Sequence, residues 1–199
     1  MPDLSSSEIP EITFLIETDR LKSVLRRTHL HDSSRLENSA EHSWQLGLAV
    51  LSMHRLADEP IDVLRALKMA LIHDVVEVDA GDTFVYDEVG NADKFEREEK
   101  AAKRLYALLP QVGQELHDLW LAYEKHNCPE SRFVGALDRF LPILANCQTG
   151  GLGWRTHGIS LAKVLKRNAE IKEGSVRLWE QAERMIHACF QGSKMVDLA

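Results

Sequence analysis

Apolar residues recur at spacings of three and four along nearly the whole chain, and this pattern indicates amphipathic helices. Leu46, Ala49 and Met53, for example, would share one helical face. Alternating strand patterns are nearly absent, and the best candidate, residues 83–86, is too short and isolated to build a sheet. The sequence therefore predicts an all-α fold.

Helix-capping and helix-breaking residues indicate where the expected helices begin and end. Asn38 is expected to cap the second helix, with Glu41 at the capping-box position. Pro142 is expected to kink or end its helix unless tertiary packing tolerates it. Helices are expected near residues 9–26, 38–57, 61–73, 111–125, 130–146 and 159–190, the last with a break at Gly174. A further charged helix is expected to follow the loop at 77–91 and to end before Pro110, and another loop is expected at 29–36. No linker or internal repeat divides the chain, so a single helical bundle over residues 1–199, with its core at about 10–190, is expected.

Bulk composition excludes several classes of partner. The formal charge of −7 argues against a protein that grips a nucleic acid polymer, because no basic excess neutralises phosphates. No apolar run approaches the ~20 residues that span a bilayer, so no membrane partner is expected. The three cysteines lack CxxC spacing, and the first residues lack the pattern of a secretory signal, so a cytoplasmic protein is expected.

Three positions carry polar side chains on faces that should point to the core. His42 lies on the face of Leu46, the pair His73–Asp74 ends the most apolar helix, and Asp138 lies between apolar neighbours. Each has an ordinary explanation when taken alone. His42 could bond a backbone carbonyl, and His73 could favour a helix C-terminus beside an exposed Asp74.

Asp138 could likewise form a salt bridge with Arg139 or Arg132. Taken together, however, two imidazoles and two carboxylates on core faces satisfy one another through a shared divalent cation. Mixed His and Asp ligation suits Mn, Co, Fe, Ni or Zn and is tolerable for Mg. Four protein ligands on an octahedral ion leave two positions for water and substrate, as hydrolysis requires.

Three short segments resemble the HD-domain superfamily of metal-dependent phosphohydrolases. They read Ala-Glu-His-Ser at 40–43, Leu-Ile-His-Asp at 71–74 and Ala-Leu-Asp-Arg at 136–139. Residues 72–82, Ile-His-Asp-Val-Val-Glu-Val-Asp-Ala-Gly-Asp, are similar to the HDxxExxxGD signature of its 5′-deoxynucleotidase branch, and residues 38–43 also match that branch. The resemblance covers roughly residues 10–190. It implies an all-α HD domain, one divalent metal and removal of the 5′ phosphate from nucleoside monophosphates.

The resemblance also implies roles for individual residues. The implied metal ligands are His42, His73, Asp74 and Asp138.

Glu77 and Asp82 would be carboxylates that face the substrate without binding the metal, and Arg27 would contact the phosphate. The branch can carry an aromatic residue after this arginine that disfavours ribose. Thr28 stands there in this chain, so a weaker preference for deoxyribose is expected.

The mechanism that we infer from these roles is attack of a metal-bound water on phosphorus, with Arg27 neutralising the growing charge. Glu77 is the preferred acid or base, because it follows His73 by one helical turn, and Asp82 is its alternative. Ordinary explanations remain open for all three residues. The two carboxylates could belong to a solvated acidic loop, and Arg27 to a basic patch with Arg26.

Two other functions fit the same motifs. One is hydrolysis of a different phosphate ester, such as guanosine tetraphosphate, and the other is a non-catalytic, metal-stabilised protein that binds nucleotides. The expected partner is in each case a small-molecule nucleotide, and a symmetric homodimer is the commonest assembly for such enzymes. His117 and His126 have no clear helical-face argument, so a second metal is not expected.

Overall fold

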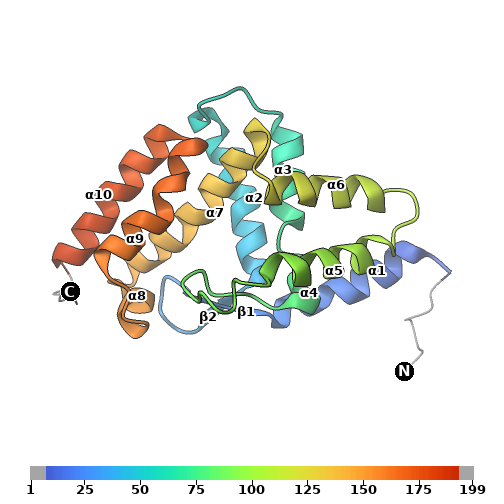
Figure 1. Cartoon of the computed structure of the whole chain (residues 1–199), viewed down its shortest axis with the longest axis horizontal. Helices are drawn as coiled ribbons and strands as arrows, with labels where there is room; N and C mark the ends of the chain where they lie inside the picture. Colours follow the sequence, from blue (N-terminus) through green and yellow to red (C-terminus); the bar gives the residue numbers. More distant parts are fainter. Residues whose placement is uncertain (1–7, 193–199) are drawn as a thin grey trace.

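The computed structural model describes residues 8–192, which form a bundle of helices with one short β-hairpin at its edge (Figure 1). The helices are α1 Pro10–Asp19, α2 Ser39–Met53, α3 Val63–Ile72, α4 Glu77–Ala80, α5 Lys94–Tyr106, α6 Gly113–Glu124, α7 Pro129–Gln148, α8 Leu152–Thr156, α9 Leu161–Asn168 and α10 Val176–Gly192. The hairpin strands are β1 Leu25–His29 and β2 Leu36–Asn38, and three short 3-10 helices are Arg20–Ser23, His54–Leu56 and Ala169–Glu173. The all-α expectation is confirmed apart from this small sheet.

Helix α7 is the central element, since it packs against α2, α3, α6 and α10. Its buried residues Phe133, Leu137 and Ile143 join Leu46 of α2 and Met69 of α3 in the main core. Burial of these large side chains is the main source of stability in such a domain. Helices α2 and α3, which are neighbours in the sequence, thus pack against the distant helix α7 along one seam.

The second helix begins as predicted. Asn38 Oδ1 accepts a hydrogen bond from the Glu41 backbone N–H at 2.9 Å, and Glu41 Oε2 accepts one from the Asn38 N–H at 3.1 Å. This capping box satisfies two N–H groups at the helix start. The predicted core stripe is confirmed as well, because Leu46 and Ala49 are buried.

The prediction of one helix over residues 9–26 is wrong at its C-terminal end. Helix α1 ends at Asp19, a 3-10 helix covers Arg20–Ser23, and Leu25–His29 form strand β1. The strand pairs antiparallel with β2, and the Ser39 N–H donates to the Val24 carbonyl at 3.0 Å. Pairing with a distant segment therefore overrides the local helical spacing.

The acidic loop predicted for residues 77–91 contains a helical turn, α4 Glu77–Ala80. Gly81 ends this turn with φ of 73°, in the left-handed region that favours glycine. Residues 83–86 form no strand, as expected.

The C-terminal half follows the prediction closely. Helix α7 runs through Pro142 without a break, and the Asn146 side-chain amide donates to the Pro142 carbonyl at 2.9 Å. The expected break at Gly174 is confirmed, and a Cβ there would lie 2.3 Å from the Arg132 carbonyl oxygen. Each helix within residues 8–192 is too short or too polar to cross a membrane.

Candidate metal centre and active site

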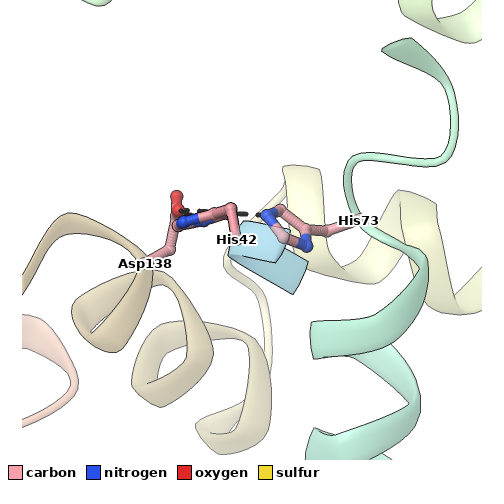
Figure 2. A group of neighbouring side chains, drawn as sticks. All are labelled: His42, His73 and Asp138. Atoms are coloured by element: carbon pink, nitrogen blue, oxygen red, sulfur yellow. Dashed lines mark hydrogen bonds and ion pairs between the residues drawn. The ribbon is translucent and has the colours of Figure 1, made fainter. Parts of the chain in front are cut away.

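His42 and Asp138 meet at the seam between α2 and α7 (Figure 2). His42 Nε2 lies 2.7 Å from Asp138 Oδ1, and the imidazole is fully buried. His42 therefore does not bond a backbone carbonyl, which was its ordinary explanation. Asp138 does not pair with an arginine either, because Arg139 contacts Glu170 and Arg132 contacts Glu59.

His73 follows the last residue of α3, and its neighbours determine the tautomer of its neutral ring. Its Nδ1 lies 3.0 Å from the Ala70 carbonyl oxygen, which can only accept a hydrogen bond. Nδ1 must therefore carry a proton, so the neutral ring has its lone pair on Nε2. Nε2 is buried and makes no hydrogen bond of good geometry, although Asp74 Oδ1 lies 3.0 Å from it, and this nitrogen is the one that could bind a metal.

The three side chains could together hold a metal ion. One ligand atom each from His42, His73 and Asp138 lies within 4.8 Å of the others. His73 Nε2 lies 3.9 Å from Asp138 Oδ1, while the other Asp138 oxygen accepts a hydrogen bond from the Tyr123 hydroxyl at 2.9 Å. Two imidazole nitrogens and a carboxylate oxygen are donors that suit a divalent transition metal. The donor set thus fits the metal that the sequence predicts.

Asp74 is buried beside this cluster rather than exposed. Its Oδ1 lies 3.0 Å from His73 Nε2, and its Oδ2 accepts a hydrogen bond from Arg26 Nη1 at 2.7 Å. One oxygen of Asp74 thus lies close to the metal-compatible group, while the other is bound to an arginine.

The field at the cluster is strongly negative. Burial lowers the pKa of His73, but the charges of Asp74 and Asp138 outweigh burial and raise it to about 9. Burial, with the charge of Arg26, lowers the pKa of His42. Burial would raise the pKa of Asp138, but its bond with His42 holds that pKa well below its usual range. The carboxylates thus require positive charge between the two rings, and a divalent ion would displace the proton from His73.

Arg26 contributes to the site although the sequence reasoning did not select it. Besides Asp74, its guanidinium faces Glu37 at 3.4 Å and Asp82 at 4.0 Å, and only 12% of its side chain is exposed. Glu37, also not selected, is buried and lies 3.7 Å from His42 Nδ1. Arg26 and Glu37 come from opposite strands of the hairpin. Their signal in the sequence would have been the period of two that a strand requires.

Arg27 and Thr28 border a cleft next to the cluster. Arg27 is exposed and Thr28 is half-buried. The cleft has a cavity volume of about 140 Å³ and is open to solvent, and Asp82 and Asp138 also line it.

Glu77 and Asp82 are not part of a solvated acidic loop. Glu77 is 4% exposed and accepts a hydrogen bond from the Ser39 hydroxyl. Burial, assisted by Asp74, raises the pKa of Glu77 well above its usual range, while Arg26 opposes the effect. Burial also raises the pKa of Asp82. Of the two, Glu77 is the better candidate for a proton donor, because its pKa is raised well above the usual range.

The other histidines in question lie apart from the cluster. His117 packs between Tyr106 and Trp120, and His126 Nδ1 lies 3.3 Å from the Ser131 carbonyl. Among residues 8–192, the only group of three or more ligand-type side chains close enough to share a metal contains neither histidine.

Sequence comparison relates the chain to known proteins. The sequence profile of the HD domain family matches residues 18–179. The 5′-deoxynucleotidase HDDC2 of Homo sapiens is 33% identical over 135 residues, which are 67% of this chain and 65% of that protein. The 5′-deoxynucleotidase YGK1 of Saccharomyces cerevisiae is 29% identical over 122 residues, which are 59% of this chain and 55% of that protein. The chain thus spans less than two thirds of the length of these two relatives.

Structural comparison gives a match over nearly the whole length. A predicted metal-dependent phosphohydrolase from Magnetospirillum magnetotacticum is 44% identical with a TM-score of 0.88, and the match covers 96% of each chain. The HD domain-containing protein YGK1 has a TM-score of 0.59 at 19% identity, over 94% of this chain and 90% of that one. The second match shows a shared fold alone.

Removal of one imidazole should abolish metal binding. We expect wild-type protein to hold close to one transition metal ion per chain, and His73→Ala to lose it. The variant deprives Asp74 and Asp138 of His73 and of the metal, although Arg26 and His42 remain against them, at a cost of roughly 3 kcal/mol, or on the order of 10 °C in melting temperature for a domain of this size. Elemental analysis and thermal melts measure both quantities.

The matched control is His31→Ala, since His31 is exposed. That variant should keep its metal and its melting temperature. Wild-type protein that contains no metal, and gains no thermal stability from Mn, Co, Ni or Zn, would contradict the site.

Proposed function

Because the chain belongs to the HD-domain family, we propose that it is a metal-dependent phosphohydrolase that removes the 5′ phosphate from ribo- and deoxyribonucleoside 5′-monophosphates. This proposal rests on the groups that the fold brings together in one buried site. A His–Asp cluster suited to a metal lies beside Arg26 and beside two carboxyl groups, Glu77 and Asp82, with raised pKa values. The names of the relatives support the same reaction and substrate class. A single HD domain over residues 1–199 is part of the proposal.

The proposed cofactor is one divalent ion per chain, held by His42, His73, Asp74 and Asp138. When bound, such an ion supplies a Lewis acid for the phosphoryl oxygens and lowers the pKa of a coordinated water. The nitrogen and oxygen donors suit Mn, Co, Fe, Ni or Zn, with Mg as a weaker fit.

Arg26 is the side chain best placed to hold the phosphate next to this ion. Its guanidinium is bound to Asp74 and faces Asp82, so it is fixed at the border between the cluster and the cleft. Fixed positive charge at that border neutralises the charge that grows on the phosphoryl oxygens. Arg27, exposed at the rim of the same cleft, would contribute a second, more mobile contact.

Glu77 is the proposed proton donor to the leaving group. Its raised pKa favours the neutral acid, and Ser39 donates to its Oε2, so the acidic proton belongs on Oε1. In the reaction, water adds its oxygen to phosphorus, the bond from phosphorus to O5′ breaks, and O5′ receives a proton. Asp82, at the cleft, would take the proton from the attacking water.

We propose that the protein is located in the reducing cytoplasm, which agrees with its three free cysteines.

We also propose a homodimer, which would form through α2 and α3. Trp44, Leu48 and Leu51 on α2 and Leu64 and Leu71 on α3 are between 47% and 64% exposed. Exposed apolar side chains that recur along neighbouring helices are typical of a contact surface. Light scattering on wild type and Trp44→Glu should report a dimer and a monomer, and a monomeric wild type would overturn this assignment.

A panel of nucleotides tests the function. The metal-loaded protein should release phosphate from nucleoside 5′-monophosphates and leave 3′-monophosphates largely intact, because one side of the pocket must seat the sugar. Thr28 should allow ribose and deoxyribose with little discrimination, and Thr28→Trp should raise the preference for deoxyribose. Activity on guanosine tetraphosphate with none on monophosphates would favour the other ester, and binding without turnover would favour a non-catalytic protein.

Replacement of Glu77 by Gln separates chemistry from binding. Glu77→Gln removes the transferable proton and keeps the size, so turnover should fall by about 10²–10⁴-fold. Metal content should stay unchanged, because the proposed ligand set is complete without Glu77. Since an acid must be protonated, wild-type turnover should decline as the pH rises through the raised pKa of Glu77.

Glu88→Gln, an exposed glutamate of the same segment, is the matched control and should behave as wild type. Near-normal turnover of Glu77→Gln would transfer the role to Asp82. Loss of the metal in that variant would instead make Glu77 a ligand.

A further inference from the structure

Two arginines line the cleft at a place that the proposed reaction does not use. Arg139 comes from α7, directly after Asp138, and Arg167 comes from α9. The Nε atoms of both are buried and lack a hydrogen-bond partner. Arg139 forms an ion pair with Glu170, whereas Arg167 forms no ion pair or hydrogen bond within residues 8–192. The cleft thus contains a guanidinium without a protein partner.

A half-buried guanidinium without a partner costs free energy of folding. Burial lowers the pKa of Arg167, and the nearby charge of Arg139 lowers it further. Glu170, the acid that could compensate both, is already bound to Arg139. The chain as a whole carries a formal charge of −7, so the pair is not a by-product of a basic surface. An arginine placed at such a cost is expected to meet an anionic partner.

Tyr86 adds a hydroxyl group to the two guanidinium groups in the cleft. Burial raises the pKa of Tyr86 to about 12, so its hydroxyl stays protonated and can donate a hydrogen bond. The amide of Asn146 is already bound to the Pro142 carbonyl and the Trp154 N–H. Arg139, Arg167 and Tyr86 are therefore the donors that remain for a ligand, and they suit one that accepts hydrogen bonds.

We propose that Arg167, with Arg139 beside it, forms a second anion-binding site in the cleft, which holds a second phosphate of the nucleotide substrate. This inference rests on the proposed function, because the first phosphate is assigned to Arg26 and the metal cluster. The chemistry is unchanged. Water adds to the 5′ phosphorus, the bond to O5′ breaks, O5′ gains a proton, and the second phosphate stays on the sugar as an anchor.

Charge favours a phosphate over a nucleobase edge. An uncharged carbonyl of a base could accept from one guanidinium, but it would not offset the repulsion between two of them. A phosphate dianion offers several acceptor oxygens and compensates that repulsion. The charge of Asp138, a proposed metal ligand, acts on Arg167. The second site is therefore close to the metal cluster, and we place the second phosphate on the 3′ oxygen, with the adjacent phosphate of a 5′-diphosphate as the alternative that the test separates.

The test compares nucleotides that share one base. Hydrolysis and calorimetric binding are measured with deoxyadenosine 5′-monophosphate, deoxyadenosine 3′,5′-bisphosphate and deoxyadenosine 5′-diphosphate on the metal-loaded full chain. The bisphosphate should bind roughly 10-fold or more tightly than the monophosphate, as expected for added charge-assisted hydrogen bonds. Arg167→Ala should remove most of this advantage. Arg167→Lys keeps the positive charge and should recover part of the bisphosphate's advantage. It replaces the alanine variant if that variant unfolds.

Lys166→Ala is the matched control, because it removes one positive charge from an exposed position of the same helix. It should leave the ratio between the nucleotides unchanged. If only the 5′-diphosphate binds more tightly than the monophosphate, and Arg167→Ala abolishes that difference, the second site is supported. The second phosphate is then the one adjacent to the 5′ phosphate rather than one on the 3′ oxygen. Equal binding of all three nucleotides, or an equal loss for all three in Arg167→Ala, would overturn the proposal in favour of base recognition.

Failure of the proposed function gives a different result. If no nucleotide is hydrolysed, the binding ratio and its dependence on Arg167 still decide the second site. If the monophosphate is hydrolysed and the bisphosphate has no advantage, the function stands and the second site is rejected.

Discussion

Buried charges that compensate one another organise the functional part of this structure. Asp74 and Asp138 lie where carboxylates are costly to bury, and each has cationic or hydrogen-bonding groups against it. Arg26 and His73 supply part of that compensation from the hairpin and from α3. A divalent ion between the imidazoles would complete it, so metal binding and stability of the fold are expected to be coupled.

The packing of three helices makes this arrangement possible. The side chains of His42 and Asp138 occupy positions in the apolar stripes of α2 and α7, so the packing that builds the core also brings them together. His73 follows α3 and is oriented by the Ala70 carbonyl. Ligands held by a close-packed core lose little entropy when they bind an ion, because their rotamers are already restricted. The site is thus a modified part of the core rather than an addition to the surface.

The cleft beside the cluster is lined by both carboxyl groups and arginines. Near the metal cluster, burial raises the pKa of Glu77 and Asp82, which favours groups that exchange protons. Arg139 and Arg167 provide positive charge in the same cleft, opposed by the charges of Glu170 and Asp138. Proton transfer and substrate recognition are therefore assigned to separate groups, so specificity can change without loss of the catalytic carboxyls.

Helical periodicity is a local property, so the helical class, the capping box at Asn38 and the placement of His42 and Asp138 on core faces could be predicted from the amino-acid sequence. The strand at residues 25–29 could not be predicted in this way, because it depends on pairing with residues 36–38. The hairpin brings Arg26 against Asp74, and neither local spacing nor composition reports such a pairing. The unpaired state of Arg167 likewise depends on which distant partner Glu170 binds, and only the packed chain decides that.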